Sequence, residues 1–97
     1  MNFYNYVCPN SGETLTTLLM HKNIKINRIV SSNEIEPIEY KQEEDEWVFV
    51  VQGEATLLIQ EETKILKSGD ILFIPKQIPH RVIKTKQNTL WLTIHIT

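Results

Sequence analysis

The stretch of sequence that decides the fold is GDILFIPKQIPH, which spans residues 69–80. It opens with the turn-forming pair Gly69-Asp70, continues with four apolar residues, and ends in a loop with two prolines before His80. Glycine and proline mark the ends of regular elements, and such an apolar run has the length of a short buried strand. The pattern therefore predicts a strand over residues 71–75 and a loop that presents His80 at the start of the next strand.

A second informative stretch lies upstream, where residues 45–60 read DEWVFVVQGEATLLIQ. The run 46–52 is rich in β-branched and aromatic residues, and Gly53-Glu54 separates it from the run 55–60. Two such runs joined by a two-residue turn containing glycine are typical of a β-hairpin. This stretch therefore predicts two strands and the turn between them.

The rest of the chain alternates in the same way between short apolar-rich runs and turns. Strands are predicted at residues 24–29, 35–40, 46–52, 55–60, 63–67, 71–75, 80–85 and 90–96. Pro37 makes the run 35–40 an edge strand, because proline cannot donate a hydrogen bond to a β-ladder. Short antiparallel strands at close spacing build an all-β sandwich or barrel, which we expect over residues 24–96.

The segment 1–22 is predicted to precede the barrel and to contain the one short helix of the chain. Leu15, Leu18 and Leu19 have the i, i+3, i+4 spacing of a helix face. This spacing predicts a helix of about two turns over Glu13–Met20, weakened by its threonines.

Length and composition limit the class of protein. The 97 residues suffice for one small domain, which we expect to span residues 1–97. Hydrophobic residues make up 41% and charged residues 23%, a balance typical of globular proteins. The net charge of −2 gives no support for nucleic-acid binding, and no apolar run is long enough to cross a membrane. A single cysteine, Cys8, and an N-terminus unlike a secretory signal favour a cytoplasmic location.

Two spacings in the chain resemble the two motifs of the cupin family. Glu46 is followed by six residues and Gly53, as in the second half of the first cupin motif. Gly69, five residues, Pro75, four residues and His80 are similar to the second motif. The letters DEW and QGEA around the first motif resemble those of small single-domain cupins. The resemblance covers the whole predicted barrel and implies a double-stranded β-helix, or jelly-roll barrel.

The resemblance also implies a site inside the barrel. Cupins that hold a metal usually surround it with two histidines, a glutamate and a third histidine. This chain has Tyr40 and Gln42 at the positions of the first two histidines, and Glu46 and His80 at the other two. The implied ligand-binding residues are therefore Tyr40, Gln42, Glu46 and His80. A divalent transition metal (Fe, Mn, Ni or Zn) would be held by Glu46, His80 and the amide oxygen of Gln42; the alternative is that no metal is bound.

A few convergent polar groups in an apolar pocket are typical of a small-molecule site. We therefore expect the chain to bind a compact polar molecule in the barrel, with Glu46 and His80 central and with or without a divalent metal. As an enzyme it would perform a metal-assisted oxygenation or an isomerisation, and the sequence leaves open whether it is an enzyme. The alternatives are metal-free ligand binding and a structural homodimer without catalytic activity.

The strand over residues 46–52 is apolar on both faces. Val48 and Val50 point to one face, and Trp47, Phe49 and Val51 point to the other. One face can line the barrel, but the other must also be covered from water. We expect a homodimer to cover it, with a contribution from the N-terminal segment, and we expect Trp47 to lie in that interface.

His95 lies on the last predicted strand, where it shares a face with Trp91 and Thr93. The four aliphatic residues on the opposite face of residues 90–96 resemble a core face. We therefore expect His95 to lie on the outer or interface side of the barrel. The functional alternative is that His95 replaces a missing ligand.

Overall fold

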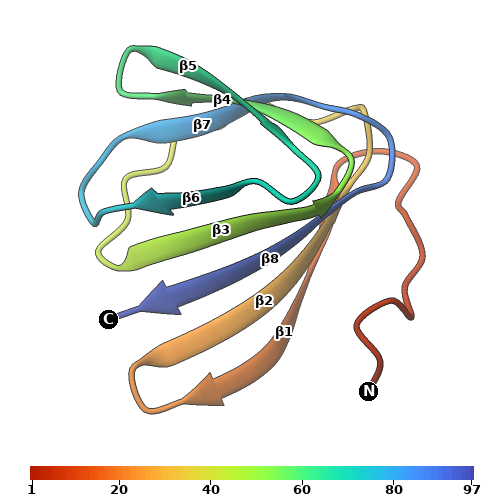
Figure 1. Cartoon of the computed structure of the whole chain (residues 1–97), viewed down its shortest axis with the longest axis horizontal. Helices are drawn as coiled ribbons and strands as arrows, with labels where there is room; N and C mark the ends of the chain where they lie inside the picture. Colours follow the sequence, from red (N-terminus) through yellow and green to blue (C-terminus); the bar gives the residue numbers. More distant parts are fainter.

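The computed structural model describes residues 1–97 and contains eight β-strands and no helix (Figure 1). The strands are β1 (Glu13–His21), β2 (Ile24–Ser31), β3 (Asp45–Gln52), β4 (Glu54–Ile59), β5 (Glu62–Lys67), β6 (Ile71–Ile74), β7 (His80–Thr85) and β8 (Thr89–Ile96). Since the chain forms no helix, it has no helical segment that could cross a membrane. The predicted all-β class is confirmed.

The strands form two antiparallel sheets that face each other (Figure 1). The larger sheet has the order β1-β2-β8-β3-β6 and the smaller sheet has the order β5-β4-β7. Between them lies a hydrophobic core in which Val48, Val50 and Trp91 of the larger sheet pack with Ala55 and Leu57 of the smaller. Each fully buried aliphatic side chain of this kind contributes roughly 1.5–3 kcal/mol to folding. This two-sheet arrangement fits the predicted jelly-roll barrel.

Gly53 marks the point where the chain leaves β3 and enters β4, passing from the larger sheet to the smaller. Its φ angle of +93° lies in the region that favours glycine. A Cβ atom at this position would lie 2.7 Å from the Cα of Thr89. The two backbones approach too closely for any side chain, which explains the glycine of the first motif.

The predicted helix over Glu13–Met20 is wrong, because these residues belong to strand β1. The strand pairs with β2 from Glu13 opposite Ser31 to His21 opposite Ile24. The register shifts between Thr17 and Leu19, so the alternation of side chains is interrupted there. The leucine spacing that imitates a helix face runs across this irregularity, and the threonines favour a strand.

The predicted edge strand over residues 35–40 is also absent. Only Tyr40 pairs, in an isolated bridge to His80. The Tyr40 N–H donates to the His80 carbonyl at 2.7 Å, and the His80 N–H donates to the Tyr40 carbonyl at 2.9 Å. The segment therefore pairs with a strand only at Tyr40, opposite the start of β7.

The facing predicted for β8 is inverted. Trp91, Thr93 and His95 are 4%, 1% and 7% exposed, and all three line the interior. Their aliphatic neighbours Leu92 and Ile94 lie on the outer face and are only partly buried. The aliphatic face of β8 does not show which side of the strand points into the barrel, because the outer face of this sheet is apolar as well.

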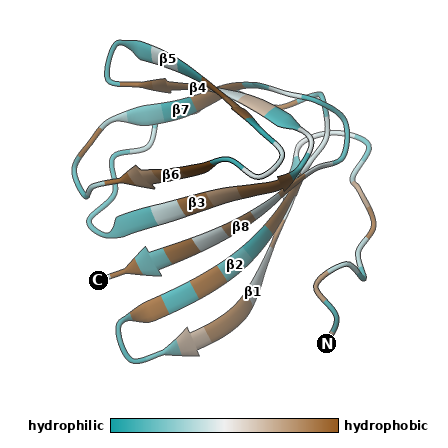
Figure 2. Cartoon of the chain, viewed as in Figure 1, coloured by the Kyte–Doolittle hydropathy of each residue, from teal (hydrophilic) through white to brown (hydrophobic).

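One apolar row crosses the outer face of all five strands of the larger sheet. In register order it consists of Leu19, Ile26, Ile94, Trp47 and Phe73. The outer members are exposed, at 49% for Leu19 and 53% for Phe73. Figure 2 shows hydrophobic residues along β3, β6 and β8, whereas the loops are mostly hydrophilic. Most of this face therefore has no cover within the chain.

The N-terminal segment covers one end of the outer face. The Arg28 guanidinium donates to the carbonyls of Phe3 and Asn5 at 3.1 and 3.2 Å. The same group lies over the ring of Tyr6, 5.6 Å from its centroid, in a cation–π contact. The segment thus contributes cover, as expected, while the predicted homodimer stays a prediction.

Candidate functional site

A cavity of about 140 Å³ lies inside the barrel between the two sheets. Most of its wall is hydrophobic, with side chains such as Val48, Leu57 and Trp91. Its polar groups come from five different parts of the chain: Glu13, Tyr40, Gln42, Glu46, His80, Thr93 and His95. All four residues predicted from the sequence therefore line one cavity. Ligand binding by these residues stays a prediction.

At one end of the cavity, the Glu46 carboxylate lies between two imidazoles. His80 Nε2 is 3.6 Å from Glu46 Oε1, and His95 Nε2 is 3.7 Å from Glu46 Oε2. All three residues are buried, at 7–8% exposed. Glu46 and His95 meet because they are directly opposite each other across β3 and β8, whereas His80 comes from the smaller sheet. The cluster therefore links the two sheets.

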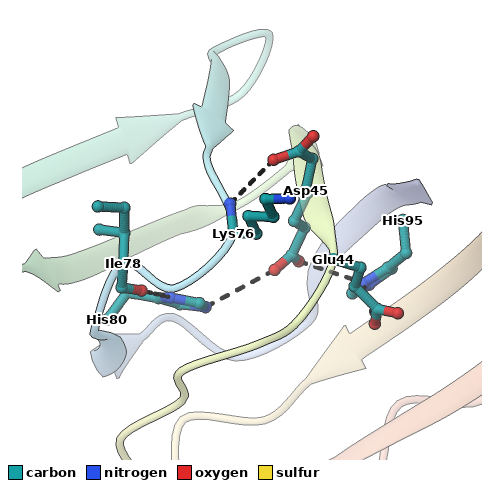
Figure 3. A network of polar contacts seen from close by, with 7 residues as sticks. Glu44, Asp45, Lys76, Ile78, His80 and His95 are labelled. Carbon is teal, nitrogen blue, oxygen red and sulfur yellow. Dashed lines mark hydrogen bonds and ion pairs between the residues drawn. The ribbon is translucent and has the colours of Figure 1, made fainter. Parts of the chain in front are cut away.

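The loop before β7 fixes the orientation of His80. Its Nδ1 atom lies 2.9 Å from the carbonyl oxygen of Ile78, which can only accept, so Nδ1 carries a proton and Nε2 is directed at Glu46. The loop is tied to β3 in turn, because the Lys76 N–H donates to Asp45 Oδ1 at 2.9 Å (Figure 3). The loop between the two prolines thus places the imidazole beside the carboxylate of the neighbouring strand.

The protonation of His80 reflects two opposing effects. Burial has the largest effect on the pKa of His80 and lowers it. The contact with Glu46, the Ile78 carbonyl and the charge of Glu46 each raise the pKa, and together they bring it above its usual value. Glu46 therefore favours the imidazolium form of His80, and the pair can exchange a proton with a bound molecule.

His95 was expected on the outside of the barrel, and its place in the cavity corrects that expectation. Its second nitrogen, Nδ1, lies 3.0 Å from Glu44 Oε1 but is not aligned for a hydrogen bond. His95 thus lies between two carboxylates, Glu44 at the surface side and Glu46 in the cavity. The alternative, that His95 replaces a missing ligand, stays a prediction.

Tyr40 and Gln42 lie at the edge of the cavity. The Tyr40 ring stacks on His80 with centroids 5.9 Å apart and remains 41% exposed. Burial and the negative charges of Glu13 and Glu46 raise the pKa of Tyr40, so its hydroxyl stays protonated at neutral pH. Gln42 directs its backbone carbonyl to the Gln77 N–H at 2.8 Å, and its side-chain Oε1 is buried without a protein partner.

Sequence reasoning missed Glu13 and Thr93 and misplaced His95. Glu13 was assigned to a helix that does not exist, so its position at the cavity could not be derived. Thr93 and His95 share a face with Trp91, but only the antiparallel register with β3 shows that this face is internal. The alternation along β8 separates the two faces of the strand. It does not show which face lines the barrel interior.

The residues of the cavity do not provide the metal-binding set that the resemblance implies. No group of three or more His, Cys, Asp or Glu side chains is arranged to hold a metal ion. The nearest Glu46 oxygen is Oε1 for His80 and Oε2 for His95, at 3.6 and 3.7 Å. Gln42 adds only a neutral amide oxygen, and the raised pKa of Tyr40 disfavours a phenolate ligand.

The fold and the site together define a small jelly-roll barrel with a carboxylate and two imidazoles in its interior. The family described as Cupin domain matches residues 29–95, and the chain belongs to this family. A comparison with curated proteins gave no match.

Solved structures extend the similarity to the whole chain. A Ralstonia eutropha JMP134 protein, provisionally assigned as a mannose-6-phosphate isomerase, is 31% identical to this chain, with a TM-score of 0.91. The match covers 99% of this chain and 95% of the Ralstonia chain. A Streptococcus pyogenes protein of unknown function is 19% identical, with a TM-score of 0.83 and coverage of 94% and 79%. A cupin superfamily protein from Desulfitobacterium hafniense DCB-2 is 18% identical, with a TM-score of 0.83 and coverage of 94% and 83%. The last two share the fold.

Proposed function

We propose that this chain binds a compact polar small molecule inside the barrel, with Glu46 as the central group. The observation that supports this proposal is the buried carboxylate between two imidazoles at the cavity wall. Burying ionisable groups costs free energy unless they are paired, and an apolar core of the same shape would avoid that cost. Retaining three of them at one cavity favours a role in binding.

The dimensions of the cavity favour a small ligand. A volume of about 140 Å³ is well below the roughly 300–1,000 Å³ of pockets that hold drug-sized ligands. A molecule with a few polar atoms on a short carbon skeleton suits it. Its apolar part would contact Val48 and Trp91, and its polar part would reach Glu46 and His80.

The proposal is tested with three probes that share a three-carbon skeleton and a central hydroxyl: 1-amino-2-propanol, 1,2-propanediol and lactate. We expect at least one to shift the backbone NMR signals of cavity residues in a saturable way, and Glu46→Gln to weaken that binding. Glu61→Gln removes a carboxylate from the exposed β4–β5 turn, outside the cavity wall, and is the matched control. Binding by none of the probes would contradict the proposal.

A parallel titration tests the metal alternative. ZnCl₂ and MnCl₂ are added to the same protein without the organic probes. A saturable shift confined to the Glu46 and His80 signals, lost in His80→Gln, would restore a metal-dependent function. We expect no such shift, because no three His, Cys, Asp or Glu side chains are arranged to hold a metal ion.

A second candidate function is a proton-transfer isomerisation. It is supported by the Glu46–His80 pair and by the provisional isomerase assignment of the 31% identical Ralstonia protein. Glu46 would take the proton from the hydroxyl-bearing carbon of a small hydroxyaldehyde while His80 gives its proton to the carbonyl oxygen, forming an enediol. Return of the proton to the former carbonyl carbon, with loss of the proton from the hydroxyl on the other enediol carbon, gives the ketone.

The isomerisation is tested with glyceraldehyde in D₂O. Enzyme-dependent formation of dihydroxyacetone, with deuterium at carbon, is expected if the candidate function holds. Both Glu46→Gln and His80→Gln should abolish it, and Glu61→Gln should not. Binding of the probes without this exchange would leave the chain as a binding protein.

We also propose that a second copy of the chain covers the outer face of the larger sheet. The apolar row from Leu19 to Phe73 supports this, since exposed apolar patches mark interaction sites and a two-fold interface joins the same patch of both copies. The wild-type chain should then have the mass of a dimer by light scattering, and Phe73→Asp should have the mass of a monomer. Ile65→Asp on the smaller sheet is the matched control, because Ile65 is 57% exposed and Phe73 is 53% exposed. A monomeric wild-type chain would contradict this proposal.

A further inference from the structure

The cavity wall contains carboxylates but no permanent cation. Glu13 and Glu46 line it, and neither lysine nor arginine does. We propose that the ligand of this cavity carries a protonated amine, and that Glu13 is the residue that selects it. This inference rests on the proposed function and names the class of ligand.

The charge balance around the cavity cannot become positive near neutral pH. Three carboxylates are present, Glu13, Glu46 and the adjacent Glu44, against the two imidazoles. Lys25 pairs opposite His95 on the same face of the larger sheet but lies outside the cavity wall. Even with Lys25 counted and both histidines protonated, the sum reaches only zero. An anion such as a phosphate or a carboxylate would therefore find no net attraction.

Glu13 is held in place by a chain of two hydrogen bonds that starts at the buried Trp91. The indole N–H of Trp91 donates to Ser31 Oγ at 3.0 Å, and the Ser31 hydroxyl donates to Glu13 Oε2 at 2.7 Å. Ser31 is fully buried, whereas Glu13 reaches the solvent at the cavity wall. The chain of donors fixes one oxygen of Glu13 and leaves the other free to accept from a ligand.

A second, independent observation comes from the interior of the larger sheet. Thr93 is 1% exposed, lines the cavity, and has no protein hydrogen-bond partner at its Oγ1 atom. At the edge of the cavity, the buried Oε1 of Gln42 is likewise without a donor. Buried polar atoms in proteins are normally paired. Both atoms can accept a hydrogen bond, and an ammonium group supplies three donors and needs no acceptor.

Aromatic rings complete the environment of a cation. Trp91 and Tyr40 both contribute to the wall, and the Tyr40 hydroxyl stays neutral. A cation is attracted to the face of such rings. The same negative charges of Glu13 and Glu46 that raise the pKa of Tyr40 would stabilise a positively charged ligand beside it.

The three probes named above rank the possible ligand charges, since they differ only in the terminal ammonium, hydroxyl or carboxylate. We expect 1-amino-2-propanol to bind about five- to tenfold more tightly than 1,2-propanediol, and lactate to bind most weakly, at low ionic strength. Glu13→Gln keeps an acceptor for Ser31 but removes the charge. It should reduce the preference for the ammonium over 1,2-propanediol to about twofold or less.

Each other outcome has a definite meaning. If lactate binds most tightly, or if Glu13→Gln leaves the ranking unchanged, the inference is overturned while the proposed binding function stands. If none of the probes binds, both fail together. Glu61→Gln, outside the cavity wall, should leave the ranking intact. The ranking in the wild-type chain is itself decisive should Glu13→Gln fail to fold.

Discussion

The inner and outer faces of the larger sheet are both rich in apolar side chains, but their surroundings differ. The inner face packs against the smaller sheet, and its polar end holds Glu46 and His95. The outer face is covered by the N-terminal segment only near Arg28 and is open along the row that ends at Phe73. The comparison teaches that apolar alternation identifies the strands of this chain but does not identify its interior.

The largest expected effect comes from placing a charge on each face in turn. Val48 on the inner face is 2% exposed, and Phe73 on the outer face is 53% exposed. Val48→Asp buries an unpaired carboxylate and should cost more than about 4 kcal/mol, enough to unfold much of the population. Phe73→Asp should cost the monomer about 1 kcal/mol or less. Urea denaturation followed by circular dichroism measures both, and equal losses would contradict the assignment of the faces.

A smaller effect is expected from replacing two histidines, one of them buried and the other exposed. His95 is 7% exposed beside Glu46, whereas His21 at the end of β1 is exposed. His95→Gln leaves the buried carboxylate with one imidazole and should cost about 1–3 kcal/mol. His21→Gln should change the free energy of unfolding by less than about 0.5 kcal/mol. If the two substitutions had the same effect, His95 would not belong to the interior.

The pH dependence of stability tests the contribution of the buried His80 on the inner side of the barrel. Since the folded chain raises the pKa of His80, its contribution to stability is fully present below the unfolded value of about 6.5. That contribution is lost as the pH rises through the higher folded pKa. The melting temperature should therefore fall between weakly acidic and weakly alkaline pH, and His80→Gln should flatten that part of the profile. An identical slope in His80→Gln would show that other groups cause it.

Much of the fold followed from the sequence, because the turn residues and apolar runs of residues 45–96 agree with one another. Seven of the eight strands predicted correspond to β2 through β8, and Glu46 and His80 were placed at one cavity. Strand β1 was not predicted, because the leucine spacing across the β-bulge near Leu19 imitates a helix face. His95 and Thr93 were misplaced because the outer face is as apolar as a core. Only the register between β3 and β8 decides their facing.

The smallest expected effect on stability concerns Tyr40, which lies at the cavity edge and belongs to neither face of the sheet. Tyr40→Phe keeps the ring that stacks on His80, and the residue is 41% exposed, so stability should change by less than about 0.5 kcal/mol. The lost hydroxyl should nevertheless weaken binding of 1,2-propanediol by about two- to tenfold, because a hydrogen bond to the ligand is lost. NMR titration and thermal melting of the same sample separate the two effects. A variant that loses stability and keeps its affinity would make Tyr40 part of the scaffold, and the cavity would then end at Glu46 and His80.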